Sequence, residues 1–367
     1  MKKITELLSQ KNADKTLKCI PVDYLASTDL DLKLRNYLSV EDETALLDKL
    51  DADFFYLPGR DISQNEGIHP LYHGPKLEIT ETERVCPLGI RWQRKSFSSK
   101  YNVDEAMDCT FGRYITPKDI LDFPWPKESD FDFSPLVEEA EKNGNRIIVG
   151  GLWTGIFGDS YRMLGFERFL TAMADDPELV QTLVDRMTEM YLELNERYFI
   201  QLAGLLDIWF FGNDFGSQRG LLFSPKMWDR LFAENIRRLT DLAHRHGLAV
   251  MMHSCGGIAP LIDRLIDAGV DILDPIQISA TGMEPASLQK KFGGRIVFHG
   301  GLDTQHILVN GTTTEIRNHV KEILGTFSTE GGYVFAPSQI FQSDIPLENI
   351  VAAYETVKEL NRKQRSQ

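Results

Sequence analysis

AVMMHSCGG, residues 249–257, joins an apolar run to a histidine, a cysteine and two glycines. An apolar run without alternating polar residues is typical of a strand that is buried on both faces, as in a parallel sheet. Residues two apart in an extended strand point to the same side, so His253 and Cys255 would project together. The stretch therefore predicts a buried parallel strand that ends in two side chains able to bind metal.

Similar apolar runs recur from residue 146 onward, and amphipathic segments separate them. Predicted strands cover 53–58, 146–152, 205–211, 248–253, 270–273, 295–300 and 333–337. Predicted helices cover 177–198, 225–246, 258–268, 285–291, 313–326 and 346–361, with Ser224 as an N-cap. Alternating buried strands and helices indicate an α/β protein, and about seven such units favour a single (β/α)8 TIM barrel over a doubly wound open sheet.

The composition is that of an ordinary globular protein. Its 367 residues are 42% hydrophobic and 26% charged, with a net charge of −14. We expect one domain over residues 1–367, with the loop-rich, charged stretch 60–135 as an N-terminal elaboration near the barrel mouth. The negative charge argues against nucleic acid or an anionic membrane surface as the main partner, whereas a small-molecule substrate is compatible with it.

The sequence also predicts a cytoplasmic protein. The first 15 residues, MKKITELLSQKNADK, lack the apolar core of a signal peptide. No segment approaches the roughly 18 apolar residues that a membrane span needs. The cysteines at 19, 86, 109 and 255 have no framework spacing. We therefore expect free thiols in a reducing compartment.

The ends of the predicted strands carry the candidate chemistry, because active sites of barrels lie where strands turn into helices. The residues at or just after these ends are Trp153, Asn213, Asp214, His253, Cys255, Asp274, Gln277, His299, Asp303, Ser338 and Gln339. They are richer in metal-binding and hydrogen-bonding groups than the strand bodies. The general polarity of loops is the alternative explanation.

Among these residues, His253 and Cys255 form the motif that most directly suggests a metal. An imidazole nitrogen and a thiolate sulfur suit tetrahedral zinc. Gly256 and Gly257 would let the backbone turn tightly beside the site. The motif supplies only two ligands, so the others must come from neighbouring strand ends. An ordinary strand terminus that carries a histidine and a cysteine is the competing interpretation.

Several long stretches of the sequence can be compared as wholes with known families. They are 253–308, which begins HSCGGIAPLIDRL, together with 20–25, 37–59, 159–180, 209–228 and 331–355. These stretches resemble the uroporphyrinogen decarboxylase superfamily, and its cobamide-dependent (corrinoid) methyltransferase branch more than the haem-pathway decarboxylase. The resemblance spans nearly the whole chain and implies a single (β/α)8 barrel.

The resemblance to the haem-pathway decarboxylase is incomplete. That enzyme is expected to bind its tetrapyrrole through an arginine-rich N-terminal signature and an aspartate after the first barrel strand. Here residues 20–35 offer only Arg35, and Pro58 aligns with the aspartate. Tyr161 does match a family active-site tyrosine, although an aromatic side chain packed on the barrel rim would explain it equally. A decarboxylase for another substrate and a non-catalytic tetrapyrrole- or corrinoid-binding barrel remain as alternatives.

The methyltransferase branch implies zinc bound by His253, Cys255 and a cysteine after the last strand. This chain departs from the branch there, because Gln339 occupies that position, and this neutral side chain is itself a candidate, though weak, zinc ligand. Asp214 is the best substitute ligand, with Asp303 behind it, and either acid could instead cap a loop. The implied reaction moves a methyl group between a corrinoid and a thiol, folate or methylated (for example methoxylated) substrate. A separate corrinoid protein and homodimerisation are also implied.

Two further residues are candidates for cofactor or substrate binding. Arg219, in the loop 213–220, could hold a carboxylate or sulfonate, or pin the loop. Gln277 is assigned to the same class because it follows a predicted strand. His69 and His73 lie in a segment flanked by proline and glycine, and we expect both at the surface.

Overall fold

The structure is a computed structural model that describes residue 8 and residues 19–58, 71–80, 82–98, 101–112, 114–327 and 332–365. His69 lies outside the described residues. The chain divides into two compact units. Unit 1 comprises Met1–Phe55, Phe215–Leu222 and Met251–Gln367, and unit 2 comprises Tyr56–Asp214 and Phe223–Val250.

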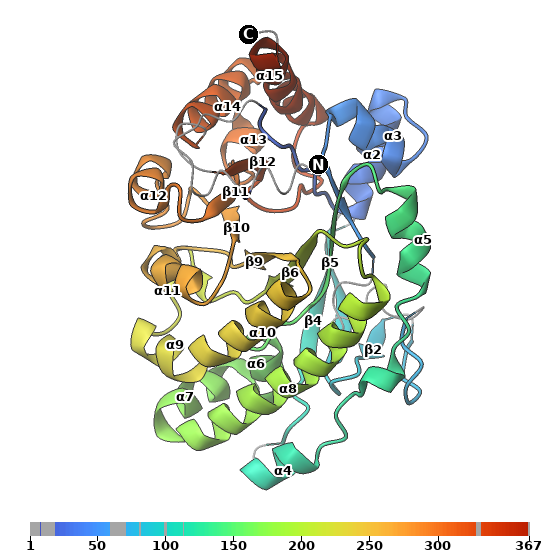
Figure 1. Ribbon diagram of the computed structural model, residues 1–367, viewed down its shortest axis with the longest axis vertical. Coiled ribbons are helices and arrows are strands. Elements are labelled where there is room, and N and C mark those ends of the chain that lie inside the picture. Colours follow the sequence, from blue (N-terminus) through green and yellow to red (C-terminus); the bar gives the residue numbers. More distant parts are fainter. Residues whose placement is uncertain are drawn as a thin grey trace. The chain divides into compact units, whose positions relative to one another are not determined.

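Seven strands of the described chain form one sheet in the order β1-β5-β6-β9-β10-β11-β12 (Figure 1). Their bounds are β1 Phe54–Tyr56, β5 Ile147–Trp153, β6 Ile208–Gly212, β9 Ala249–His253, β10 Ile272–Ile276, β11 Val297–Leu302 and β12 Tyr333–Pro337. The pairs β5–β6, β9–β10, β10–β11 and β11–β12 are parallel. The predicted α/β class with a parallel sheet is confirmed, whereas this sheet has seven strands in the described part of the chain rather than the eight of a complete barrel.

In unit 1 a short segment near the N-terminus lies beside β12. Asp23 N donates to Phe335 O at 2.8 Å, and Phe335 N donates to Pro21 O at 2.9 Å. On its other side, Asp53 N donates to Val22 O at 2.7 Å. The contacts with β12 are isolated bridges rather than a strand. Because Pro21 has no N–H, it cannot extend the ladder.

The helices of unit 1 follow or precede strands β9 to β12. They are α2 Thr28–Leu38, α3 Glu43–Leu50, η3 Ala259–Leu261, α11 Ile262–Asp267, α12 Pro285–Phe292, α13 Ile307–Asn310, α14 Thr313–Phe327 and α15 Leu347–Arg365. A small hairpin, β7 Gly216–Ser217 and β8 Gly220–Leu221, belongs to the same unit. Strands β10, β11 and β12 are buried over their whole length, which explains why their residues are mainly apolar; Asp274 on β10 and His299 on β11 are buried polar exceptions.

The helices of unit 2 pack around β5 and β6. They are α4 Pro117–Asp122, η2 Glu128–Asp130, α5 Pro135–Lys142, α6 Gly158–Leu164, α7 Phe166–Asp175, α8 Pro177–Gln201, α9 Pro225–Leu231 and α10 Ala233–Arg245. Ser224 caps α9, since its Oγ accepts from Met227 N at 3.3 Å, as predicted. The single helix expected over 225–246 is two helices, because the backbone of Phe232, with φ −124° and ψ −28°, departs from helical geometry.

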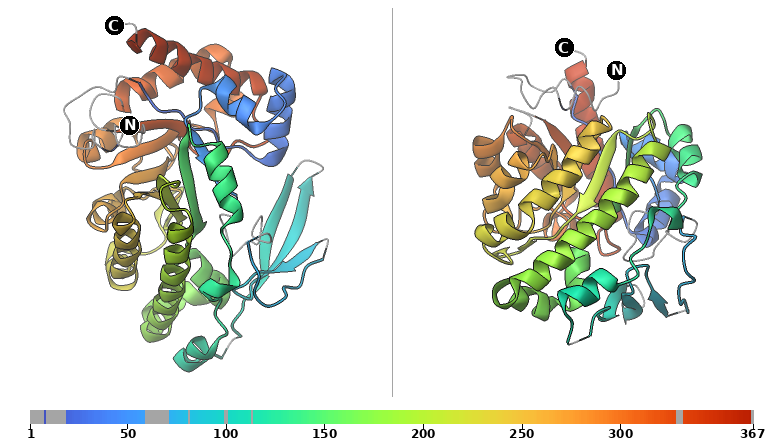
Figure 2. Two further views of the ribbon diagram at one scale, coloured as in Figure 1. Left: turned by 45° about the vertical axis from the view of Figure 1, so that its right-hand side comes forward. Right: turned by 60° about the horizontal axis from the view of Figure 1, so that its bottom comes forward.

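The stretch 60–135 contains more regular structure than the sequence predicted. An antiparallel sheet, drawn in cyan in Figure 2, comprises β2 Glu83–Val85, β3 Arg91–Ser98 and β4 Tyr101–Asp108. β3 reads RWQRKSFS and β4 reads YNVDEAMD, so neither has the apolar run from which the other strands were predicted. None of the helices in the described part of the chain is long and apolar enough to cross a membrane.

Candidate metal centre

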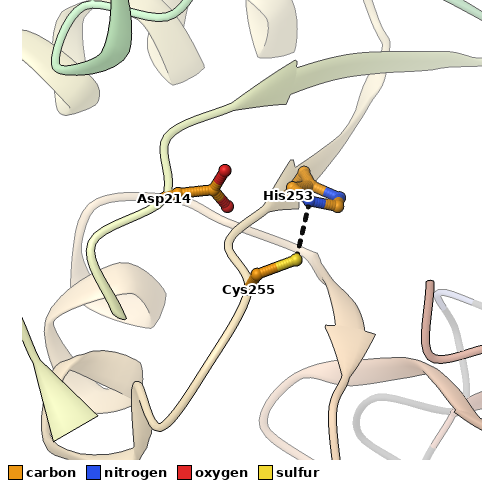
Figure 3. A group of neighbouring side chains, drawn as sticks. All are labelled: Asp214, His253 and Cys255. Carbon is orange, nitrogen blue, oxygen red and sulfur yellow. Dashed lines mark hydrogen bonds between the residues drawn. The ribbon is translucent and has the colours of Figure 1, made fainter. Parts of the chain in front are cut away.

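Three side chains with metal-binding atoms come together beyond the ends of β6 and β9. The ligand atoms of Asp214, His253 and Cys255 all lie within 4.8 Å of one another (Figure 3). His253 ends β9, and Cys255 is in the loop that follows. Asp214 is peptide-bonded to Phe215, whose N–H donates to Ser254 Oγ at 3.2 Å. In the described part of the chain, no second group of three such ligands meets the same distance criterion.

The His253 imidazole is oriented by a hydrogen bond to Asp274. Its Nδ1–H donates to Asp274 Oδ2 at 2.6 Å, and its Nε2 lies 3.2 Å from Cys255 Sγ. An imidazole that donates one ring N–H to a carboxylate presents the other nitrogen to a metal, an arrangement common in zinc proteins. Burial alone would lower the pKa of His253, but the negative charges of Cys255 and Asp274 raise this pKa well above its usual value.

The loop after β9 is held in a shape that requires glycine. Gly256 has φ +91°, and a Cβ on it would lie 2.6 Å from Ser217 O. The Gly256 N–H donates to Gln277 Oε1 at 2.8 Å. The structure thus places the Gln277 amide on the backbone of the loop that carries Cys255.

The side chain of Gln339 lies at the candidate centre. Its Nε2 donates to Cys255 Sγ at 3.4 Å, so it stands beside the sulfur at the position where the methyltransferase branch has a cysteine. Asp303, the second substitute considered, instead accepts from the N–H groups of Gln305 and His306 at 2.8 and 3.1 Å. Its carboxylate therefore caps the loop after β11.

The other predicted residues lie in different settings. Arg219 is exposed in the turn between β7 and β8. Tyr161, on α6, packs edge-on against Phe157 and Phe166 at centroid distances of 5.2 and 5.1 Å. Burial raises the pKa of Tyr161; Arg162 opposes this rise and the Asp214 charge adds to it. The phenol is therefore protonated at neutral pH.

Behind Asp274 the structure connects two of the predicted strand-end residues, Asp274 and His299, to Asp23, which the strand-end pattern did not include. His299 Nδ1 lies 2.7 Å from Asp274 Oδ1, and His299 Nε2 lies 2.9 Å from Asp23 Oδ2. Burial opposes a charged His299, but Asp274 and Asp23 raise the pKa of His299 to about 9. Burial likewise opposes a charged Asp274, but His299 and His253 lower the pKa of this carboxyl far below its usual range. Asp23 was missed, although an acid inside the apolar segment IPVDYL was a usable signal.

The donor atoms fit a zinc ion. Zinc–nitrogen and zinc–sulfur bond lengths place the two atoms about 3.5 Å apart in a tetrahedron. The separation of His253 Nε2 and Cys255 Sγ is 3.2 Å, so a small adjustment would admit the metal. The Asp214 carboxylate adds an oxygen, which zinc also accepts.

The fold and this cluster define an α/β protein with a nitrogen–sulfur–oxygen donor set beyond the ends of its parallel strands. The model of the uroporphyrinogen decarboxylase (URO-D) family matches residues 132–360, well over half of the chain. The chain therefore belongs to this family.

Comparison with solved structures agrees with the fold. A methyltransferase from Methanosarcina mazei superposes with a TM-score of 0.67 at 16% identity and covers 98% of both chains. A D-psicose 3-epimerase from Clostridium cellulolyticum H10 gives a TM-score of 0.32 at 13% identity, covering 64% of this chain and 94% of that one. No match was found among curated proteins. At these identities the structural likeness concerns the fold, and only the first score is high enough to support it.

Proposed function

We propose that this chain is a zinc-dependent methyltransferase that moves a methyl group between a corrinoid and a thiol, folate or methylated (for example methoxylated) substrate. The observation that carries the proposal is the cluster of Asp214, His253 and Cys255 within 4.8 Å, with His253 oriented by Asp274. Membership in the family and the likeness to the Methanosarcina mazei fold support it.

Several residues of the chain would have separate roles around the metal. His253 Nε2, Cys255 Sγ and the Asp214 carboxylate would hold zinc, whose Lewis acidity lowers the pKa of a substrate thiol. The Gln339 amide, which donates to Sγ, would stabilise negative charge on the sulfur. Tyr161, protonated at neutral pH, would serve as a hydrogen-bond donor rather than as a base.

Decarboxylation of a porphyrinogen has less support. A polycarboxylate substrate needs cationic side chains to bind it. Arg35 is already paired on α2, where its Nε lies 2.7 Å from Asp31 Oδ2. Pro58 offers no carboxylate at the position of the decarboxylase aspartate.

The proposal has finer parts. Residues 20–26 would take the eighth strand position of a (β/α)8 barrel, next to β12. Arg219 would contact a substrate anion, and Gln277 would act through the loop that it holds. A separate small protein would carry the corrinoid in the cytoplasm, and the chain would act as a homodimer.

Metal analysis tests the proposal. The purified chain, incubated with zinc and dialysed, should retain about one zinc per chain, as a single closed donor set predicts. Cys255→Ser should abolish retention, whereas Cys109→Ser, which alters an exposed cysteine of unit 2, should not. Demethylation of methylcobalamin in the presence of a small thiol, followed by absorbance, should depend on the same cysteine. A metal-free wild type, or equal retention by Cys255→Ser, would contradict the proposal.

A further inference from the structure

A chain of hydrogen bonds, partly buried at Cys255 and His253 and fully buried beyond Asp274, runs inward from the candidate metal centre to the N-terminal segment. It connects Cys255, His253, Asp274, His299 and Asp23, in that order, over distances of 3.2, 2.6, 2.7 and 2.9 Å. The side chains of Asp23 and His299 are fully buried. All five residues belong to unit 1, although Asp23 and His299 are 276 residues apart.

The protonation state of His299 follows from its partners. Both ring nitrogens face carboxylate oxygens, which accept hydrogen bonds when they are ionised. A neutral imidazole can donate from only one nitrogen, so His299 must be an imidazolium to satisfy both carboxylates. It is therefore a buried cation between Asp274 and Asp23.

The position of this cation determines which oxygen of Asp274 is left to contact His253. Asp274 lies between His299 and His253, so each of its two oxygens has one imidazole partner. His299 occupies Oδ1 of Asp274, which leaves Oδ2 for the Nδ1–H of His253. The rotation of the carboxylate is thus fixed by a partner on each oxygen.

Asp23 is in turn fixed by the segment that contacts β12. Its Oδ1 accepts from Tyr24 N at 2.7 Å, and its backbone oxygen accepts from the hydroxyl of Tyr354 on α15 at 2.6 Å. Its own N–H donates to Phe335 O. With these contacts in place, Oδ2 of Asp23 has a defined position opposite His299.

We propose that His299 and Asp23 are positioning residues of the metal centre: they fix the orientation of Asp274, so that His253 presents Nε2 to the metal. This proposal rests on the proposed function, since it assigns a role toward the same zinc site. It also gives the N-terminal segment a part in metal binding, although that segment supplies no ligand.

Two variants test the chain of hydrogen bonds. Asp23→Asn keeps an acceptor for Tyr24 N but removes the charge, and His299→Gln removes the cation. Each should weaken zinc binding by about 10- to 100-fold, the usual effect of losing an outer partner of a ligating histidine. The affinity is measured by competition with a chromophoric zinc chelator. Tyr333→Phe, which deletes the buried hydrogen bond from Tyr333 to Gly300 O beside His299, is the matched control and should leave the affinity unchanged.

A second readout separates positioning from simple destabilisation. In the metal-free protein labelled with ¹⁵N-histidine, the wild type should show slowly exchanging ring N–H protons on both nitrogens of His299 and on Nδ1 of His253. His299→Gln should lose slow exchange at His253 Nδ1, whereas Tyr333→Phe should retain it. Unchanged zinc affinity in both variants, or a neutral His299 in the wild type, would overturn the positioning role. A wild type without zinc affinity would overturn the proposed function, and the exchange of the His253 proton would then decide the positioning by itself.

Discussion

Asp274 connects the candidate metal centre to the buried interior of unit 1. Its two oxygens contact different histidines, one on β9 and one on β11. A carboxylate that is 3% exposed cannot rely on water to stabilise its charge, so it depends on these two partners. The stability of unit 1 and the orientation of the proposed ligand His253 are therefore coupled at this side chain.

Asp274→Asn should be strongly destabilising. The variant keeps the size of the side chain but removes the charge that balances His299, and its NH₂ group would face a ring N–H. Loss of one partner of a buried ionic group costs about 3–5 kcal/mol. Urea unfolding measures the change. Asp263→Asn is the control, because Asp263 pairs with Arg295 at the surface, where such a pair contributes less than about 1 kcal/mol. Equal effects of the two substitutions would contradict this account of Asp274.

The buried imidazolium also predicts a dependence of stability on pH. The pKa of His299 rises from 6.5 to about 9 on folding, so protonated His299 stabilises the native state. This contribution, about 3 kcal/mol, is complete below pH 6.5 and is lost as the pH rises through 9. His299→Gln lacks it. The difference in unfolding free energy between wild type and variant should therefore narrow from about pH 6 to about pH 9.5. A difference that stays constant over this range would exclude a charged His299.

At the candidate centre, the local sequence predicted two neighbouring donors. It could not predict which residues distant along the chain would become their partners. The spacing of His253 and Cys255 predicted two adjacent donors because the period of a strand is fixed. Asp274 and His299 were singled out as polar residues at strand ends, without a specific role. Asp23 could not be connected to them, since its position depends on how the N-terminal segment pairs with β12.

The loop between β9 and η3 is the element that holds Cys255 in place. Gly256 and Gly247 both have positive φ angles, +91° and +76°, but their surroundings differ. A Cβ at Gly256 would meet Ser217 backbone atoms at 2.6 and 2.7 Å, whereas a Cβ at Gly247 would have no atom within 4 Å. The same substitution at the two positions therefore separates backbone strain from crowding.

Gly256→Ala should be more harmful than Gly247→Ala. The left-handed backbone alone costs an alanine about 1–2 kcal/mol, and this cost should be the whole effect at residue 247. At residue 256 the hairpin β7–β8 must also move, so we expect a loss of stability at least about 2 kcal/mol greater. Zinc affinity should fall for Gly256→Ala only, because the displaced loop carries Cys255. Urea unfolding measures the change in stability, and chelator competition measures the change in zinc affinity. Equal losses of stability for the two variants would contradict steric crowding at Gly256.

The elements that were predicted well are those whose own residues show a mainly apolar pattern. β6 and β12 are buried throughout and appear in the sequence as uninterrupted apolar runs. β3 and β4 form an antiparallel pair of strands rich in charged residues, so their pairing depends on each other rather than on a local apolar pattern. The break between α9 and α10 also has no marker such as proline or glycine at Phe232.

At the scale of the molecule, unit 1 brings the two ends of the described chain together. The side chain of Asn361 on α15 accepts from Ile20 N and donates to Ile20 O, both at 2.9 Å, across 341 residues of sequence. This pair of buried hydrogen bonds begins the segment that carries Asp23. α15 therefore supports the same segment that we assign to the metal centre.

Asn361→Ala should loosen that segment without removing any member of the buried hydrogen-bond chain. Two buried hydrogen bonds contribute about 2 kcal/mol together, and the free Ile20 groups add to the loss. Zinc affinity should fall less than in Asp23→Asn, because Phe335 and Tyr354 still hold Asp23. Asn310→Ala, which removes an exposed hydrogen bond to His306 O, should change neither quantity appreciably. Urea unfolding and zinc competition on the three variants check this order. If Asn361→Ala weakened zinc binding as much as Asp23→Asn, the position of the whole segment, rather than the charge of Asp23, would determine metal affinity.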